Sequence, residues 1–197
     1  MSQPTDQVLI KQMQAGDLQA LGQLYDRYKP LVYKTALAIT GDNEAAGDLL
    51  QDVFLRLYRF SCRFDPQRPL PPWLYRMTAN LAYTWVKRDN RWLQPAGDLA
   101  EWLAGSSKDH PQAIVEGRDD WTRVQQAVQC LPISQRVVVV LYYLDDLSLQ
   151  EISDILDIPM GTVKSRLHYG RLGLRKRLGL AGYPEGKNLP ELNFEGS

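Results

Sequence analysis

The chain has 197 residues, 44% of them hydrophobic and 23% charged, which is the composition of a folded globular protein and not of a disordered one. No apolar run approaches the ~20 residues that a membrane-spanning helix needs, and the N-terminus has neither a basic leader nor a small-residue cleavage site. We therefore expect a cytoplasmic protein. Its two cysteines, Cys62 and Cys130, support neither a disulfide framework nor a zinc knuckle, and we expect both to be reduced and structural.

Positive and negative charges balance, with 23 of each and a formal net charge of zero, which taken alone argues against a nucleic-acid partner. Their distribution along the chain is uneven. Basic residues dominate 53–92 and 160–180, whereas acidic residues gather at 42–52 and 98–120. A charged run is usually just a solvated surface, so this segregation favours a nucleic-acid partner only modestly.

Apolar residues recur at helical spacing along almost the whole chain, which predicts an all-α protein. Gly41 separates the first long helical stretch from the next, and Asp42 is placed to cap the second through its carboxylate. The proline-rich segment 64–72 is predicted to be a loop, because each proline removes a backbone donor and restricts the residue before it.

The run Val137–Val140 favours a strand by local propensity. We predict a helix there instead, because the sequence offers no second strand for pairing and Leu141 and Leu144 continue a helical stripe. The chain is thus predicted to form two small helical domains, 1–92 and 120–180. An acidic, flexible linker at 93–119 joins them, and a disordered tail follows at 181–197.

The segment 147–178 has the pattern of a helix-turn-helix. Ser148 is placed to cap its first helix, 157–159 ends that helix, and the next helix buries Val163 and Leu167. The outward side chains are Thr162, Lys164, Ser165, Arg166, His168 and Tyr169. Short hydroxyls and long cations of this kind suit a recognition helix, which contacts base edges and phosphates. The alternative is an amphipathic helical hairpin with a basic surface.

The helix after the proline-rich loop places cations, an aromatic and an amide on one face. These residues are Arg76, Asn80, Tyr83, Lys87 and Arg91. Such a stripe suits single-stranded DNA, because cations follow the phosphates while the aromatic ring stacks on a base. The alternative is an ordinary solvated helix face.

Two segments resemble regions of one known family. GDLQALGQLYDRYKPLVYKTALAITGDNEAAGDLLQDVFLRLYRF, followed by FDP and WLYRMTANLA, is similar to region 2 of the extracytoplasmic-function sigma factors of bacterial RNA polymerase. LSLQEISDILDIPMGTVKSRLHYGRLGLRKRL resembles their region 4. The match runs from about residue 17 to 178 in the right order. Gly47 departs from the family pattern, which tends to carry an acid there.

The resemblance implies a protein that binds core RNA polymerase and directs promoter recognition and DNA opening, with no catalytic activity and no cofactor. It implies core-polymerase contacts by Asp48, Gln51, Asp52 and Phe54. It assigns the minus-ten element to Arg76, Asn80, Tyr83, Lys87 and Arg88. It assigns the minus-thirty-five element to Thr162, Lys164, Ser165, Arg166, Arg171 and Arg175. Relatives are commonly held inactive by an anti-sigma protein, so we expect such a partner here.

Two other readings remain. Region 4 also resembles the helix-turn-helix of LuxR-type activators, which allows a stand-alone transcription regulator, although that leaves the first ninety or so residues unexplained. An enzyme is the weakest reading, because two Cys, two His and scattered carboxylates form no catalytic or metal motif.

Overall fold

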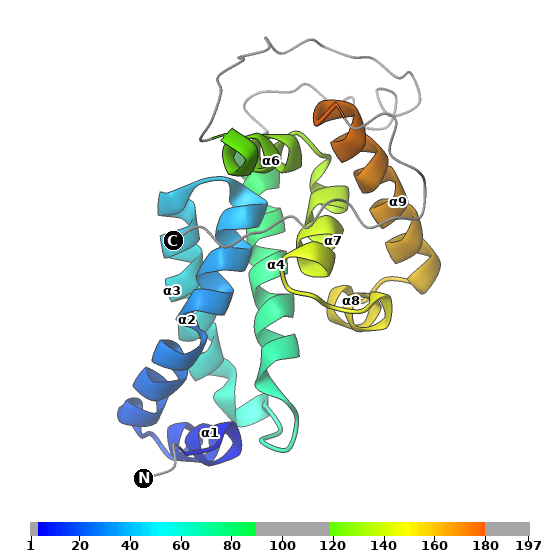
Figure 1. Ribbon diagram of the computed structural model, residues 1–197. Helices are drawn as coiled ribbons and strands as arrows, with labels where there is room; N and C mark the ends of the chain where they lie inside the picture. The colour runs from blue at the N-terminus through cyan, green and yellow to red at the C-terminus, as the bar shows by residue number, and fades with distance from the viewer. Residues whose placement is uncertain (1–3, 90–118, 180–197) are drawn as a thin grey trace.

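The computed structural model describes residues 4–89 and 119–179, and within these ranges every regular element is a helix (Figure 1). The all-α prediction is confirmed. The elements are α1 (Asp6–Gln14), α2 (Leu18–Thr40), α3 (Asn43–Phe60), the short 3-10 helix η1 (Ser61–Arg63), α4 (Leu70–Asp89), α6 (Asp119–Gln129), α7 (Ile133–Tyr143), α8 (Leu149–Leu156) and α9 (Met160–Arg177). The predicted tail lies outside the described residues, and so does the predicted linker except for its last residue, which begins α6.

Local signals in the sequence set several helix ends as predicted. The Asp42 carboxylate accepts a hydrogen bond of 2.8 Å from the Ala45 amide and caps α3. Gly41 ends α2 with a φ of 74°, a left-handed conformation that glycine adopts without a Cβ clash. The run Val137–Val140 lies inside α7, so the helix predicted there is confirmed against the strand propensity of valine.

The predicted proline-rich loop is too long at its C-terminal end. Helix α4 begins at Leu70, so Pro71 and Pro72 lie in its first turn. The first-turn amides of a helix have no intrahelical acceptor, and a proline therefore removes no hydrogen bond there. The loop itself ends before Leu70, whose side chain is fully buried and anchors the start of α4.

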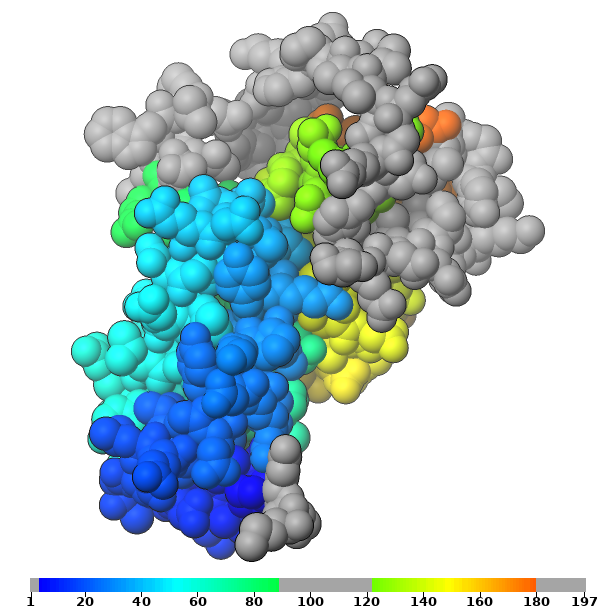
Figure 2. Space-filling model, turned by 60° about the vertical axis from the view of Figure 1, so that its left-hand side comes forward, coloured from blue at the N-terminus to red at the C-terminus, as the bar shows by residue number. Residues whose placement is uncertain are grey.

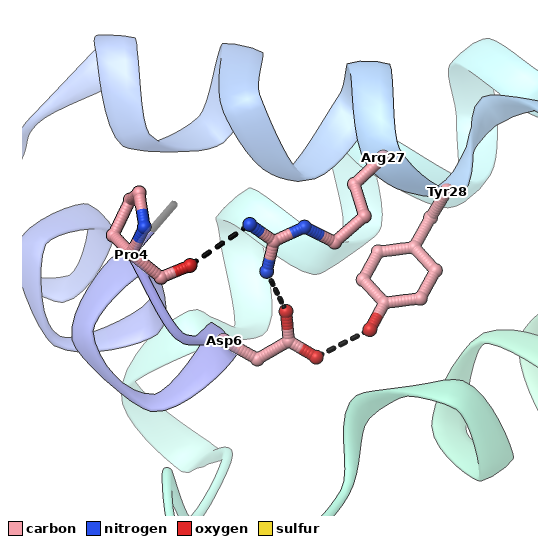
Figure 3. A network of polar contacts seen from close by, with 4 residues as sticks. All are labelled: Pro4, Asp6, Arg27 and Tyr28. Atoms are coloured by element: carbon pink, nitrogen blue, oxygen red, sulfur yellow. Dashed lines mark hydrogen bonds and ion pairs between the residues drawn. The ribbon is translucent and has the colours of Figure 1, made fainter. Parts of the chain in front are cut away.

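Helix α1 is fixed against α2 by a small polar network (Figure 3). The Asp6 carboxylate accepts hydrogen bonds from both the Arg27 guanidinium and the Tyr28 hydroxyl. Arg27 also donates to the Pro4 carbonyl over 2.8 Å. Burial and the neighbouring Asp6 carboxylate both raise the pKa of Tyr28, so the phenol stays a donor at any physiological pH.

Two apolar clusters hold the helices together. The first joins α1 to α2, α3 and α4 through buried side chains such as Leu9, Leu24 and Leu57. The second is formed by α2, α3 and α4 together with α6 to α9, so the C-terminal helices share a core with the N-terminal ones. Figure 1 shows α7 and α8 beside α4, and α7 and α6 also contact α2.

Substitutions at two glycines, Gly41 and Gly47, are expected to change stability in opposite directions. A Cβ on Gly47, in the second turn of α3, would meet no atom within 4 Å, whereas one on Gly41 would lie 2.6 Å from Cδ of Gln129. We expect Gly47→Ala to raise the free energy of unfolding by about 1 kcal/mol, because alanine is the better helix former. Gly41→Ala is the control and should destabilise. Urea denaturation followed by circular dichroism measures both, and no gain for Gly47→Ala would contradict the expectation.

Candidate polymerase and DNA interface

Helix α3 has one buried and one exposed face. Leu49, Val53 and Leu57 are packed into the core and fix the rotation of the helix. Asp48, Gln51, Asp52 and Leu55 are exposed on the opposite side. These four residues, here called the α3 face, recur at helical spacing and include three of the four residues predicted to contact polymerase.

Phe54, which the resemblance assigns to the polymerase contact, does not lie on the α3 face. Only 4% of the residue is exposed, and its ring meets that of Tyr25 edge to face at a centroid distance of 4.9 Å. Leu50 and Leu57, four residues before it and three after it, share its side of α3 and are buried. The neighbouring Leu55 is 52% exposed and was not among the residues predicted to contact polymerase. Extending the spacing of Asp48 and Asp52 by three residues would have found it.

On α4, four of the five predicted minus-ten residues are exposed, namely Arg76, Asn80, Lys87 and Arg88. Tyr83 is half-buried against the second apolar cluster, and Lys87 Nζ lies 5.1 Å from the centroid of its ring. These five residues are called the α4 strip below. Arg91 falls outside the described residues.

The start of the predicted helix-turn-helix is closed by a reciprocal cap. The Ser148 amide donates to the Glu151 carboxylate over 2.8 Å, and the Glu151 amide donates to Ser148 Oγ over 3.2 Å. The Ser148 hydroxyl also donates to the Glu151 carboxylate over 2.7 Å, and this bond together with the one from the Ser148 amide holds the pKa of Glu151 below its usual range. The turn follows at Asp157, which has a φ of 54° and ends α8. The two helices and the turn between them are therefore where the sequence predicted them.

Helix α9 packs through Val163 and Leu167, as predicted, and its contact with α7 is close. A Cβ on Gly170 would lie 2.6 Å from Cγ2 of Val139, so this position allows no larger residue without movement. The side chains that point away include Lys164, Ser165, His168 and Tyr169, all exposed, with Thr162 and Arg166 half-buried. The start of α9 therefore presents the predicted hydroxyls and cations.

Arg171, predicted to lie near a phosphate, is half-buried. Its Nε donates to the Tyr143 hydroxyl over 2.8 Å, and its guanidinium carbon lies 5.2 and 5.5 Å from the ring centroids of Tyr142 and Tyr143. Arg171 therefore braces α9 against α7, and a phosphate contact would have to use its remaining donors. Arg175 is half-buried one turn further on.

The two cysteines differ from the prediction in one respect. Cys62 and Cys130 are free thiols, but both are exposed. They fill no core position, because the neighbouring Ser61 and Leu131 are the buried residues at these helix ends. Among the described residues, no group of three or more histidine, cysteine or acidic side chains could hold a metal ion. No described helix is long and apolar enough to cross a membrane.

Residues 24–92 match the family model for sigma-70 region 2, and residues 121–172 match that for sigma-70 region 4. The ECF RNA polymerase sigma factor SigW of Bacillus subtilis is 36% identical over 86% of this chain and 94% of its own length. The chain belongs to the extracytoplasmic-function sigma factors. The ECF RNA polymerase sigma-E factor of Escherichia coli is 30% identical to this sigma factor over 86% of the chain and 92% of its own length.

Two solved structures resemble this sigma factor in fold. CnrH, in complex with the cytosolic domain of CnrY, covers 89% of the chain at 25% identity with a TM-score of 0.63, and the match spans 98% of that structure. The sigma factor RpoE from Bartonella quintana, in complex with the anti-sigma factor NepR, covers 81% at 21% identity with a TM-score of 0.61, spanning 97% of that structure. The latter likeness supports the fold alone. As a sigma factor, the protein directs transcription initiation.

Proposed function

We propose that this sigma factor uses residues 1–92 for polymerase and minus-ten binding, and residues 120–180 for minus-thirty-five binding. It acts in the cytoplasm, catalyses no reaction and needs no cofactor. The observation that carries the proposal is the position of α9, whose exposed Lys164 and Ser165 follow buried Val163 in a capped helix-turn-helix. This is the geometry in which the start of a second helix enters the major groove.

The α3 face binds the largest subunit of core polymerase. Its acids and amide are exposed, and Leu55 adds an apolar contact at 52% exposure. Because Phe54 is buried, its part is to hold α3 in position from behind. The α4 strip binds the minus-ten element, with Arg76, Lys87 and Arg88 along the backbone and Tyr83 and Asn80 toward the bases.

An anti-sigma protein is the further partner that we propose. Both solved structures above are complexes, one of them explicitly with an anti-sigma factor. A protein of that kind would act by covering the α3 face, the α4 strip or the start of α9.

Arg166→Ala is expected to weaken recognition of the upstream promoter element about tenfold or more, because a good base contact contributes ~1 to 3 kcal/mol of discrimination. Transcription from a promoter that depends on the minus-thirty-five element measures the effect. Lys176→Ala is the matched control, since Lys176 is exposed on the last turn of the same helix. Core-polymerase binding should be unchanged in both variants. If Arg166→Ala transcribes as well as the wild type, the predicted base contact of Arg166 at the start of α9 is wrong.

Two measurements separate this proposal from a stand-alone regulator. The protein should co-elute with core polymerase in gel filtration. In a titration of labelled promoter, the protein should bind specifically only as holoenzyme. The salt concentration is the same in every titration, because it strongly changes protein–DNA affinity. Tight, sequence-specific binding by the chain alone, without co-elution, would favour the regulator.

A further inference from the structure

Helix α1 carries a side chain that reaches the connection between α3 and α4. Gln14, its last residue, donates from Nε2 to the Ser61 carbonyl over 2.8 Å and to the Phe64 carbonyl over 2.9 Å. In Figure 1, α1 lies at the end of the molecule where the chain passes from α3 to α4. Figure 2 shows the dark blue N-terminal segment against the cyan segment that contains the end of α3, and α1 contacts η1. One side chain thus joins α1 to the first residue of η1 and to the residue after it.

Helix α1 is fixed well enough to serve as this anchor. Leu9, Ile10 and Met13 are buried in the apolar cluster that α1 shares with α2, α3 and α4. The start of α1 is bound to α2 through the Asp6 carboxylate, as Figure 3 shows. Directly after α1, Gly16 turns the chain with a φ of 94°. Because the helix is held along its length, its last side chain is presented to the loop in one position.

The segment that Gln14 holds is the proline-rich loop before α4, residues 64–69. Asp65 closes a turn within this loop. Its carboxylate accepts a hydrogen bond from the Gln67 amide over 2.9 Å, and its carbonyl accepts one from the Arg68 amide over 3.0 Å. The side chains of Gln67 and Arg68 are exposed. These local bonds shape the tip of the loop, whereas the bonds from Gln14 attach the start of the loop to α1.

Phe64 connects this anchor to the α4 strip. Its carbonyl accepts the hydrogen bond from Gln14, and its ring meets that of Trp73 edge to face at a centroid distance of 6.2 Å. Trp73 lies in the first turn of α4, three residues before Arg76, so the two side chains are neighbours on the helix surface. If the loop left Gln14, the Phe64 ring would no longer be held against Trp73 at the entrance to the α4 strip.

We infer that Gln14 is a positioning residue for promoter opening, which holds loop 64–69 in the conformation in which region 2 takes up the unpaired minus-ten strand. The inference rests on the proposed function, which assigns that strand to the α4 strip. Gln14 is half-buried and acts through the loop. It lies before residue 24, where the match to the region 2 model begins. A loop that is ordered before DNA arrives lowers the entropy cost of binding the strand.

Gln14→Met removes both donors and keeps a side chain of similar length. Without the two hydrogen bonds, the loop should occupy its binding conformation in a smaller fraction of chains. We expect this fraction, and with it the apparent affinity for the unpaired strand, to fall about tenfold. Titration of the holoenzyme with a labelled promoter whose minus-ten element is already unpaired measures the loss.

Two controls distinguish positioning from general damage. Gln12→Met makes the same change on another side of α1, where Gln12 is exposed, and should bind the unpaired promoter like the wild type. A duplex that carries only the minus-thirty-five element should be bound equally by wild type and Gln14→Met, because that contact belongs to α9. Affinity for core polymerase should also be unchanged. A merely structural defect would weaken all three kinds of binding together.

A label on Cys62 reports on the loop in the absence of DNA. Cys62 is exposed and lies between the two residues whose carbonyls Gln14 binds. Cys130→Ser removes the other exposed thiol, so that a nitroxide attaches at one position. The electron paramagnetic resonance line shape should show a more mobile label in Gln14→Met than in the wild type or Gln12→Met. Equal mobility in all three proteins would overturn the inference, because Gln14 would not be holding the loop.

Gln14→Glu tests the donors with a side chain of the same shape. An ionised carboxylate has no N–H group and would face two carbonyl oxygens, so it should loosen the loop at least as much as methionine. Gln12→Glu is its control, since it adds the same charge to α1. This pair decides if circular dichroism shows that Gln14→Met does not fold. Equal affinity of Gln14→Glu and Gln12→Glu for the unpaired promoter would contradict the inference.

The wild-type holoenzyme separates this inference from the proposed function. If it does not prefer the unpaired minus-ten strand to a scrambled strand, the proposed function fails and the inference falls with it, although the Cys62 label still shows whether Gln14 holds the loop. If the wild type has this preference, and Gln14→Met binds equally well with a more mobile label, the inference alone is refuted. A tenfold weaker affinity together with a more mobile label is the result that supports it.

Discussion

Arg136→Met is expected to lower the free energy of unfolding by about 3 to 5 kcal/mol, and the melting temperature by about 10 °C. Only 7% of Arg136 is exposed, and its guanidinium donates to the carbonyls of Gln129, Leu131 and Ile39 and to the side chain of Gln129. Burial lowers its pKa to about 10, so it remains charged at neutral pH. Methionine would fill the space but leave buried carbonyls without a donor, which costs ~1 to 3 kcal/mol for each.

Thermal and urea denaturation of the full chain measure this effect. Arg177→Met is the control, because Arg177 is exposed at the end of α9 and its stability effect should stay within about 0.5 kcal/mol. Arg136→Lys should lie between the two, since an ammonium group keeps the charge but not the planar fork of donors. A loss below about 1 kcal/mol in Arg136→Met would mean that water satisfies these carbonyls and that the buried guanidinium is not a major stabilising group.

Asp48→Arg is expected to weaken binding to core polymerase about thirtyfold, equivalent to ~2 kcal/mol at an interface residue. Asp48 is exposed on the α3 face beside buried Leu49, so the substitution changes the surface without disturbing the core. Reversing its charge would place two like charges together if polymerase offers a cation there. Stability should be unchanged, because surface substitutions away from core contacts usually have small effects.

Affinity for core polymerase in a fluorescence titration, supported by co-elution, measures the effect. Asp26→Arg is the matched control, since it makes the same charge change on the exposed part of α2 and disrupts only a surface pair with Lys29. Leu55→Ala should give a smaller loss than Asp48→Arg. Equal binding by Asp48→Arg and Asp26→Arg would show that the α3 face is not the polymerase contact.

Local chemistry in the sequence determined much of this protein. Asp42 and Ser148 cap the starts of α3 and α8, and Gly41 ends α2. The spacing of Val163 and Leu167 determines which side of α9 faces outward. Caps and helical periodicity could be predicted because both depend on neighbours within a few residues. Helical periodicity also predicted which side of α3 carries the exposed Asp48 and Asp52. The helical period also puts Phe54 among the apolar residues of α3, and it is buried.

Contacts between distant segments were decided only by the tertiary structure. Nothing near Arg136 in the sequence indicates that its guanidinium reaches the Ile39 carbonyl, and nothing near Thr35 indicates that its hydroxyl meets Asp145. From the sequence, Arg171 was expected to lie near a phosphate. In the structure its guanidinium carbon lies 5.2 and 5.5 Å from the ring centroids of Tyr142 and Tyr143. Periodicity tells which side of a helix is buried but not which helix covers it, so the packing of α6 to α9 on α2 and α4 emerges only from the tertiary structure.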